Sequence, residues 1–307
     1  MNKILLYTSA LCLAWLQTGC HSNSELTLKT VPEGKTIAQG MQGQREYDLI
    51  CRALRSIPAP VEAAAVLKHR DHKFRSQLLN SPQKTSYYVS GASKALNLGV
   101  YGADMAYCNL YNSTYQSLKY LEATRRLSQE LQVDDQVDFG ALDKLISSAG
   151  NLDSLMSMMN LSFMGISNRM QDRGQLSLSL MMVTGGWIEG LYLLTQSANQ
   201  SGDLALAQKV GEQQVVLGQL MALLNQMQQD SDHQEVLQAL RSLQDAYADV
   251  QITHTFTGES EIVDRDGIAT FIDRRRTLIA ITKNQVAGIA QAALEARKML
   301  TVKLVKS

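Results

Sequence analysis

TGGWIEGLYLL, at residues 184–194, is the stretch of sequence that says most about the fold. It resembles an upstream stretch, LGVYGADMAY at residues 98–107, when Gly99 is placed on Gly185. A glycine inside a helix costs about 1 kcal/mol relative to alanine, so several glycines in a few residues indicate a place where another helix comes close. The two stretches therefore predict close helix–helix packing.

The same superposition places Tyr101 on Trp187. Ile188, Leu191 and Leu194 follow the tryptophan at helical spacing and continue an apolar surface around it. This pattern predicts that Trp187 is a buried packing residue. The alternative is that the two aromatic rings line a groove for a ligand.

The apolar run over residues 176–194 contains one charged residue, Glu189. A run of this length raises the possibility of a membrane span. Glu189, the adjacent glycines and the serines at 177 and 179 argue against it, because charged and polar groups are costly in a bilayer. We expect a buried core helix.

Composition favours a helical protein. The chain has 307 residues, 45% of them apolar, only 4 prolines, and 29 basic against 29 acidic residues. The balanced charge argues against a nucleic-acid partner, which would call for a basic face. We expect a mainly α fold, either a multi-helix bundle or an irregular helical array.

Apolar residues recur at helical spacing along most of the chain, with breaks at proline, glycine and asparagine–serine positions. The predicted helices cover residues 37–57, 60–80, 82–107, 113–127, 139–149, 151–172, 176–199, 203–229 and 233–250.

The spacing of apolar residues changes after Val250. Alternating apolar and polar residues, together with the turn-like Asp264–Gly267, predict a small β-hairpin near 251–281. Within it, 251–257 and 262–272 supply the hairpin, and 277–281 is a second β-like run. Thr282 and Gln285 have the spacing of a capping box, which predicts a final helix over 283–300.

The N-terminal residues resemble a bacterial lipoprotein signal. Lys3 is followed by an apolar segment, Ile4–Leu16, and by LQTGC ending at Cys20. The resemblance implies cleavage before Cys20, whose thiol then carries a diacylglycerol and whose freed amine is acylated. An ordinary secretory signal and an uncleaved anchor are the alternatives.

We therefore expect a signal peptide over 1–19, a flexible polar tether over 20–35 and a single helical domain over 36–307. The membrane, reached through lipid on Cys20, is the expected partner. His21 is not the aspartate that retains some lipoproteins at the inner membrane, so the outer membrane is the expected location.

Four segments are similar to motifs in an uncharacterised family of bacterial lipoproteins. They are GVYGADMAY at 99–107, YLEATRRLSQELQV at 120–133, NLDSL at 151–155 and GGWIEGLYLLTQ at 185–196. The resemblance spans about residues 90–300. It implies a fold and an address, and it carries no activity, cofactor or catalytic residue.

Asp104 and Glu189 fall within the two glycine-rich stretches, where they could face each other as a pair of carboxyl groups for acid–base chemistry. A solvated or capping role is the simpler interpretation. Cys51 and Cys108 remain once Cys12 and Cys20 are assigned to the signal and the lipid, and they are either disulfide-bonded or small buried thiols.

His69 and His72 lie three residues apart among basic neighbours, which favours an exposed charged face over a metal site. The Arg274–Arg276 run is interpreted as a solvated cluster, and 264–267 as a turn because it lacks the acidic positions of a calcium loop. No cofactor or metal is predicted.

Two functions remain. The first is a lipid-anchored helical module that binds a protein, a peptide or an apolar ligand, or serves as a scaffold. The second is a hydrolase-like enzyme that uses Asp104 and Glu189. An open cleft between the two carboxyl groups would favour the enzyme, whereas burial against an arginine or the backbone would favour the module.

Overall fold

A computed structural model describes residues 37–59, 67, 73–148, 151–227, 230–256, 261–265, 268–272 and 275–303. The chain divides into two compact units, Met1–Tyr47 and Asp48–Ser307. In the first unit the described residues form the beginning of helix α1, Ile37–Arg55. The remaining elements belong to the second unit.

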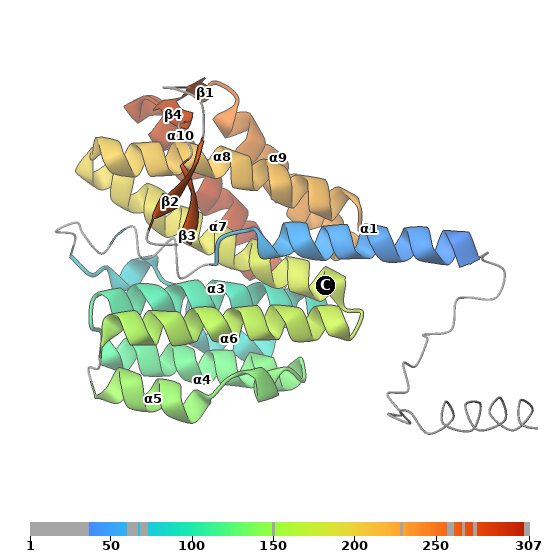
Figure 1. The fold of residues 1–307 in the computed structure, drawn as a ribbon. Coiled ribbons are helices and arrows are strands. Elements are labelled where there is room, and N and C mark those ends of the chain that lie inside the picture. The colour runs from blue at the N-terminus through green and yellow to red at the C-terminus, as the bar shows by residue number, and fades with distance from the viewer. Residues whose placement is uncertain are drawn as a thin grey trace, which may run out of the picture. The chain divides into compact units, whose positions relative to one another are not determined.

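The second unit is mainly α, as the composition predicts, with short 3-10 turns between helices and a small β element near its end (Figure 1). Its elements are η1 Ser76–Leu78, η2 Pro82–Tyr87, α3 Gly91–Leu110, α4 Thr114–Glu130, η3 Asp134–Gln136, α5 Phe139–Ser147, α6 Leu152–Asp172, α7 Leu176–Ser201, α8 Leu204–Asn225, α9 Ser231–Tyr247, β1 Gln251–Phe256, β2 Glu261–Arg265, β3 Ile268–Ile272, β4 Arg275–Ala280, α10 Lys283–Lys298 and a final turn, Met299–Lys303.

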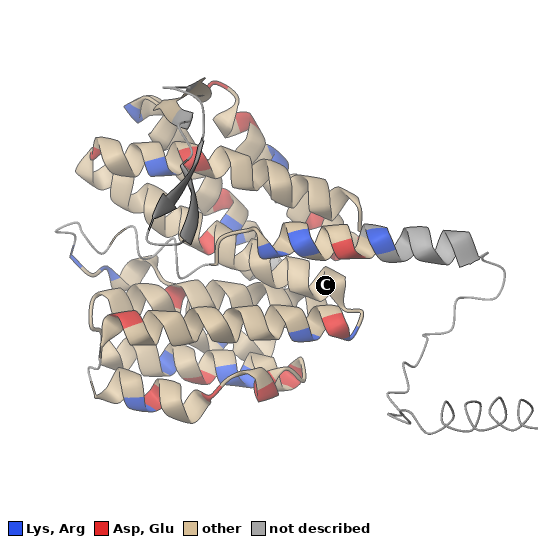
Figure 2. Ribbon diagram, viewed as in Figure 1, with Lys and Arg blue, Asp and Glu red and all other residues tan. Residues whose placement is uncertain are grey.

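Helix α7 is shared by two groups of helices. On one side α3, α4, α5 and α6 follow one another around a closed circuit that returns to α7, and on the other side α8, α9 and α10 do the same (Figure 1). A helix that packs against other helices on every face must carry apolar residues on every face. This requirement matches the sequence of α7, whose only charged residue is Glu189, and the nearly uncharged ribbon in Figure 2.

Of the described helices, α7 is the one that is long and apolar enough to cross a membrane by length and composition. However, 94% of its most apolar window is buried inside the protein. Its apolar surface is therefore already used in packing against other helices.

Helices α3 and α7 touch through their backbones at the predicted glycines. A side-chain carbon added at Gly99 would overlap the carbonyl oxygen of Met182. One added at Gly185 would overlap the carbonyl oxygen of Leu96. The expectation of a close helix–helix approach at these glycines is met, and each helix places its own glycine against the other backbone.

The two helices run in the same direction. Gly91, at the start of α3, faces Leu178 near the start of α7, and Gly99 further along faces Gly186. The superposition aligned Gly99 with Gly185, and in the structure Gly99 lies against the neighbouring residue, Gly186. Parallel packing at matched register also places the two N-termini at the same end of the pair.

The sequence prediction of one helix over 82–107 is wrong. A 3-10 turn, Pro82–Tyr87, is followed by extended backbone, and α3 begins only at Gly91. Ser90 caps the new helix, because its Oγ accepts a hydrogen bond from the N–H of Ser93 at 3.0 Å. The end of the helix predicted over 60–80 is also wrong, since residues 73–80 hold only the turn Ser76–Leu78.

The predicted β-hairpin near 251–281 is present, with a pairing that differs in detail. Strand β1 pairs with β4, from Gln251 opposite Ala280, and β2 pairs with β3. The outer run 275–280 therefore closes the hairpin instead of standing apart from it. The predicted capping box is confirmed at the start of α10, where Thr282 and Gln285 exchange hydrogen bonds.

A matched pair of substitutions on α3 tests the backbone contact. Gly99→Ala would place a methyl group inside the α7 backbone, so we expect a loss of about 3 kcal/mol or more in the free energy of unfolding. Gly102→Ala, on the same helix, meets no atom within 4 Å, so we expect a gain of about 0.5–1 kcal/mol. Urea unfolding followed by circular dichroism measures both. Equal stabilities for the two variants would contradict the contact.

Candidate functional site

Asp104 of α3 and Glu189 of α7 meet in the interior between the two parallel helices. Both residues are fully buried, and they are near enough for Glu189 to influence the pKa of Asp104. Burial raises the pKa of Asp104 well above its ordinary value, and the neighbouring charge of Glu189 raises it further. Its raised pKa means that Asp104 favours its protonated form.

One shared proton accounts for both carboxyl groups. Asp104 Oδ1 and Glu189 Oε1 are buried oxygens that have no hydrogen-bond partner among the described residues. A proton on Asp104 that is donated to Glu189 satisfies both atoms at once. The two carboxyl groups then carry a single negative charge.

Arg297 of α10 balances that charge. Its Nε lies 2.6 Å from Glu189 Oε2, and its guanidinium sits 4.5 Å from the centre of the Tyr192 ring. Its Nη2 donates to the carbonyl oxygen of Leu78 at 2.9 Å. The sequence alone did not single out Arg297, because nothing in its own neighbourhood marks it as buried.

The same cluster holds the backbone of the segment before α3. The N–H of Asn80 donates to Asp104 Oδ2 at 3.1 Å, and its carbonyl oxygen accepts from the hydroxyl of Tyr120 at 2.6 Å. The carbonyl oxygen of Ser81 accepts from the hydroxyl of Tyr101 at 2.8 Å. Side chains from α3, α4 and α10 thus supply partners that a buried irregular segment cannot find in itself.

Tyr101 is buried in this cluster as a structural donor. Its hydroxyl also lies 3.1 Å from that of Tyr88, which accepts from Asn80 Nδ2 at 3.2 Å. Burial raises the pKa of Tyr88, Tyr101 and Tyr120, so all three phenols stay protonated and able to donate.

Trp187 faces another part of the core. It is buried, with 5% of its surface exposed, and its Nε1 donates to Gln213 Oε1 of α8 at 2.9 Å. The prediction that Trp187 is a buried packing residue is confirmed. Tyr101, Asp104 and Glu189 therefore come together, while Trp187 joins α7 to α8.

Other sequence candidates do not join the cluster as reactive groups. Cys51 and Cys108 are buried as thiols, and burial raises the pKa of Cys108, which disfavours a reactive thiolate. Cys20, His69 and His72 lie outside the described residues. Within the described part of the chain, no group of three or more His, Cys, Asp or Glu side chains could hold a metal.

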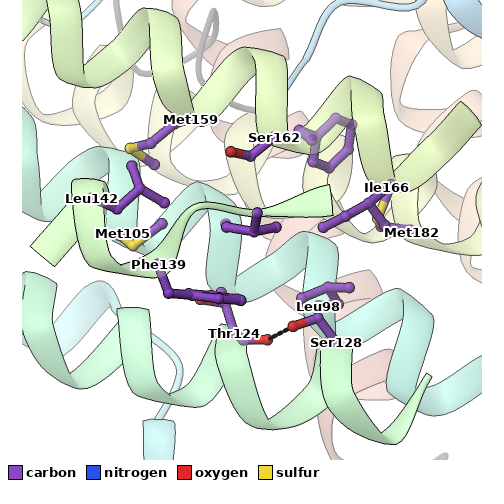
Figure 3. A pocket seen from close by; sticks show the side chains of 13 residues that line it. Leu98, Met105, Thr124, Ser128, Phe139, Leu142, Met159, Ser162, Ile166 and Met182 are labelled. Atoms are coloured by element: carbon purple, nitrogen blue, oxygen red, sulfur yellow. Dashed lines mark hydrogen bonds between the residues drawn. The ribbon is translucent and has the colours of Figure 1, made fainter. Parts of the chain in front are cut away.

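An apolar cavity lies between α3, α4, α5 and α6 (Figure 3). Its volume is ≈ 50 Å³. The lining residues are Leu98, Gly102, Met105, Thr124, Ser128, Val137, Phe139, Leu142, Met159, Ser162, Phe163, Ile166 and Met182.

The carboxyl pair can be tested with two isosteric substitutions. Asp104→Asn keeps an acceptor for the N–H of Asn80 and adds a donor for Glu189, so it imitates the protonated acid. We expect it to unfold at the same or higher urea concentration than the parent at neutral pH. Glu189→Gln leaves the buried guanidinium of Arg297 without its carboxylate, and we expect a loss of about 3–5 kcal/mol.

The pH dependence gives the control. Because the pKa of Asp104 is raised on folding, the folded chain keeps a proton that the unfolded chain loses as the pH rises above the ordinary value for aspartate. Asp104 therefore makes the free energy of unfolding fall as the pH rises. Asp104→Asn removes this contribution to the pH dependence. Urea unfolding at about pH 5 and about pH 8 compares the two proteins. A parent and variant with the same slope would contradict the shared proton.

Comparison of the chain with protein-family models, with curated proteins and with solved structures found no match. The function is therefore argued from the sequence and the geometry described above.

Proposed function

We propose that the protein is a lipid-anchored lipoprotein whose helical body binds a partner protein through the apolar cavity between α3, α4, α5 and α6. The observation that carries the binding role is the cavity itself, whose lining is almost entirely apolar (Figure 3). A preformed apolar hollow at a helix surface offers burial for one apolar group from outside.

The size of the cavity selects the kind of ligand. Whole small molecules occupy pockets of roughly 300–1,000 Å³, whereas this cavity measures ≈ 50 Å³. Such a volume suits a single aliphatic side chain of a partner.

Two polar side chains of the lining, Thr124 and Ser128, are hydrogen-bonded within α4 and are not available to a polar ligand. Ser128 Oγ donates within its own helix to the carbonyl oxygen of Thr124 at 2.9 Å, and Thr124 Oγ1 donates to that of Leu121 at 2.8 Å. Both hydroxyl groups are thus occupied, and the wall they present is mostly carbon. Three methionines, at 105, 159 and 182, give that wall side chains that adapt to an incoming group.

The anchor rests on the sequence. LQTGC at 16–20 resembles a lipoprotein signal, and His21 favours the outer membrane over the inner. A partner-binding body on a lipid tether would act at the extracytoplasmic face of that membrane.

The hydrolase-like alternative at Asp104 and Glu189 has less support. Both carboxyl groups have no exposed surface, and one oxygen of each is already bonded, Glu189 Oε2 to Arg297 and Asp104 Oδ2 to the N–H of Asn80. Acid–base work needs a substrate within hydrogen-bond reach of such groups.

The anchor is tested by Cys20→Ser. We expect the variant to take up no fatty acid and to leave the membrane fraction, because a lipid on Cys20 is the proposed attachment. Metabolic labelling with a clickable fatty acid, followed by membrane fractionation, measures both. Label that persists on the variant would contradict the lipoprotein assignment.

The cavity is tested by Gly102→Leu. An added carbon at Gly102 meets open space, so leucine there is expected to fill the cavity without unfolding the chain. Gly218→Leu on α8 is the matched control, because that exposed position also meets no atom within 4 Å. Affinity capture from membranes should retain a specific partner with the parent and with Gly218→Leu and lose it with Gly102→Leu. A partner retained equally by all three would place binding elsewhere.

A further inference from the structure

Three side chains from two parts of the chain, Ser177 at the start of α7 and Asp230 and His233 at the start of α9, form a hydrogen-bonded row. Ser177 Oγ lies 2.8 Å from His233 Nε2, and His233 Nδ1 lies 2.6 Å from Asp230 Oδ1. A hydroxyl, an imidazole and a carboxylate in this order are the arrangement that activates a serine as a nucleophile.

The elements hold the row in place. Ser177 is the second residue of α7, His233 is the third residue of α9, and Asp230 is the N-cap of α9. Asp230 Oδ1 also accepts from the N–H of His233 at 2.9 Å, so the cap itself fixes the carboxylate beside the imidazole. The imidazole is buried, with 2% of the residue exposed, and Ser177 is half-buried.

The carboxylate selects the working tautomer of the histidine. An ionised Asp230 can only accept, so Nδ1 carries the proton and Nε2 is left to accept from the hydroxyl of Ser177. Burial acts to raise the pKa of Asp230, but the N–H and the ring of His233 outweigh it and hold that pKa below its ordinary value. The acid is therefore ionised at neutral pH.

The start of α7 supplies donors for a developing negative charge. Its first intrahelical bond runs from the N–H of Ser179 to the carbonyl oxygen of Gln175, which leaves the N–H groups of residues 176–178 without an intrahelical acceptor. The N-cap Gln175 makes no side-chain capping bond, and its Oε1 is a buried atom without a hydrogen-bond partner among the described residues. These donors belong to Ser177 and the residues on either side of it, and they are the groups available to the oxyanion that forms on the carbonyl oxygen of an attacked substrate.

A third helix begins at the same place. Ser90, the N-cap of α3, donates from its Oγ to Asp232 Oδ2 of α9 at 2.8 Å. The N-termini of α3, α7 and α9 thus converge, and each contributes partial positive charge to the region. The site is separate from the carboxyl pair and does not depend on the lipid anchor or on the cavity.

We propose that Ser177 and His233 form a nucleophile and general base, oriented by Asp230, that hydrolyses small carboxylic esters. Ser177 Oγ attacks the ester carbonyl carbon and its proton passes to His233 Nε2. The C–O bond to the alcohol then breaks, and the alcohol leaves with that proton. Water attacks the acyl-serine in the same way, which releases the carboxylic acid and restores Ser177.

Esters are the expected substrate class because the carboxylate that orients the histidine is exposed to water. The side chain of Asp230 is 59% exposed, so it stabilises the imidazolium less than a buried carboxylate would. A weaker base suits a substrate with an alcohol as leaving group better than an amide, whose amine leaves less readily.

The test uses a fluorophosphonate probe, which modifies activated serines, on the full-length protein. We expect the probe to label the parent, and peptide mass spectrometry to place the label on Ser177. Hydrolysis of p-nitrophenyl acetate should fall about 10²-fold or more in Ser177→Ala. Ser179→Ala is the matched control, since Ser179 Oγ is buried against Ser167 Oγ at 2.8 Å and has no part in the row.

Mapping the label on the parent keeps the test independent of whether a variant folds. A parent that takes up no probe at neutral to mildly alkaline pH, or that carries it on another serine, overturns the proposal. So does ester hydrolysis that Ser177→Ala leaves unchanged while its thermal midpoint matches the parent.

The positioning role of Asp230 needs a separate readout. Asp230→Asn keeps an N-cap oxygen for α9 and removes the charge beside the imidazole. We expect labelling to slow about tenfold or more, and the inflection of its pH profile, which reports the imidazole, to move to lower pH. An unchanged inflection together with an unchanged rate would show that the row is only a structural contact.

Discussion

The backbone contact between α3 and α7 is the constraint on which the rest of the structure depends. Gly99 and Gly185 each lie against the opposing backbone, so the two helices pack in parallel at one register and no other. That register brings Asp104 beside Glu189 in the interior. It also sets the N-termini of α3 and α7 at one end, where α9 joins them through Ser90 and Ser177.

The buried charges follow from this packing and also reinforce it. Two carboxyl groups and one guanidinium are costly to remove from water, and the cost falls only if every oxygen and N–H finds a partner. A shared proton leaves one negative charge opposite Arg297, which gives a neutral cluster. Because Arg297 also holds the carbonyl oxygen of Leu78, the cluster ties the last helix to the segment before α3.

Local patterns predicted local structure well, and long-range contacts less so. The glycines of α3 and α7, the burial of Trp187 and the capping box at Thr282 could be predicted because spacing and residue type decide them within a few positions. The start of α3 at Gly91 was missed, because the segment before it is held by distant side chains: Asp104 of α3 accepts from the N–H of Asn80, and Tyr120 of α4 donates to its carbonyl oxygen. Arg297 contacts Leu78 across 219 positions, which no periodicity reveals.

The position of the serine, histidine and aspartate has a physical reason in the same packing. Interior polar groups such as Asp104 and Glu189 have no exposed surface, so a substrate does not reach them. A helix N-terminus differs, because its first N–H groups have no partner within the helix. Parallel packing at the glycines gathers such ends on one side of a rigid pair of helices. The helix ends whose first N–H groups have no partner within the helix therefore lie where Ser177 meets His233.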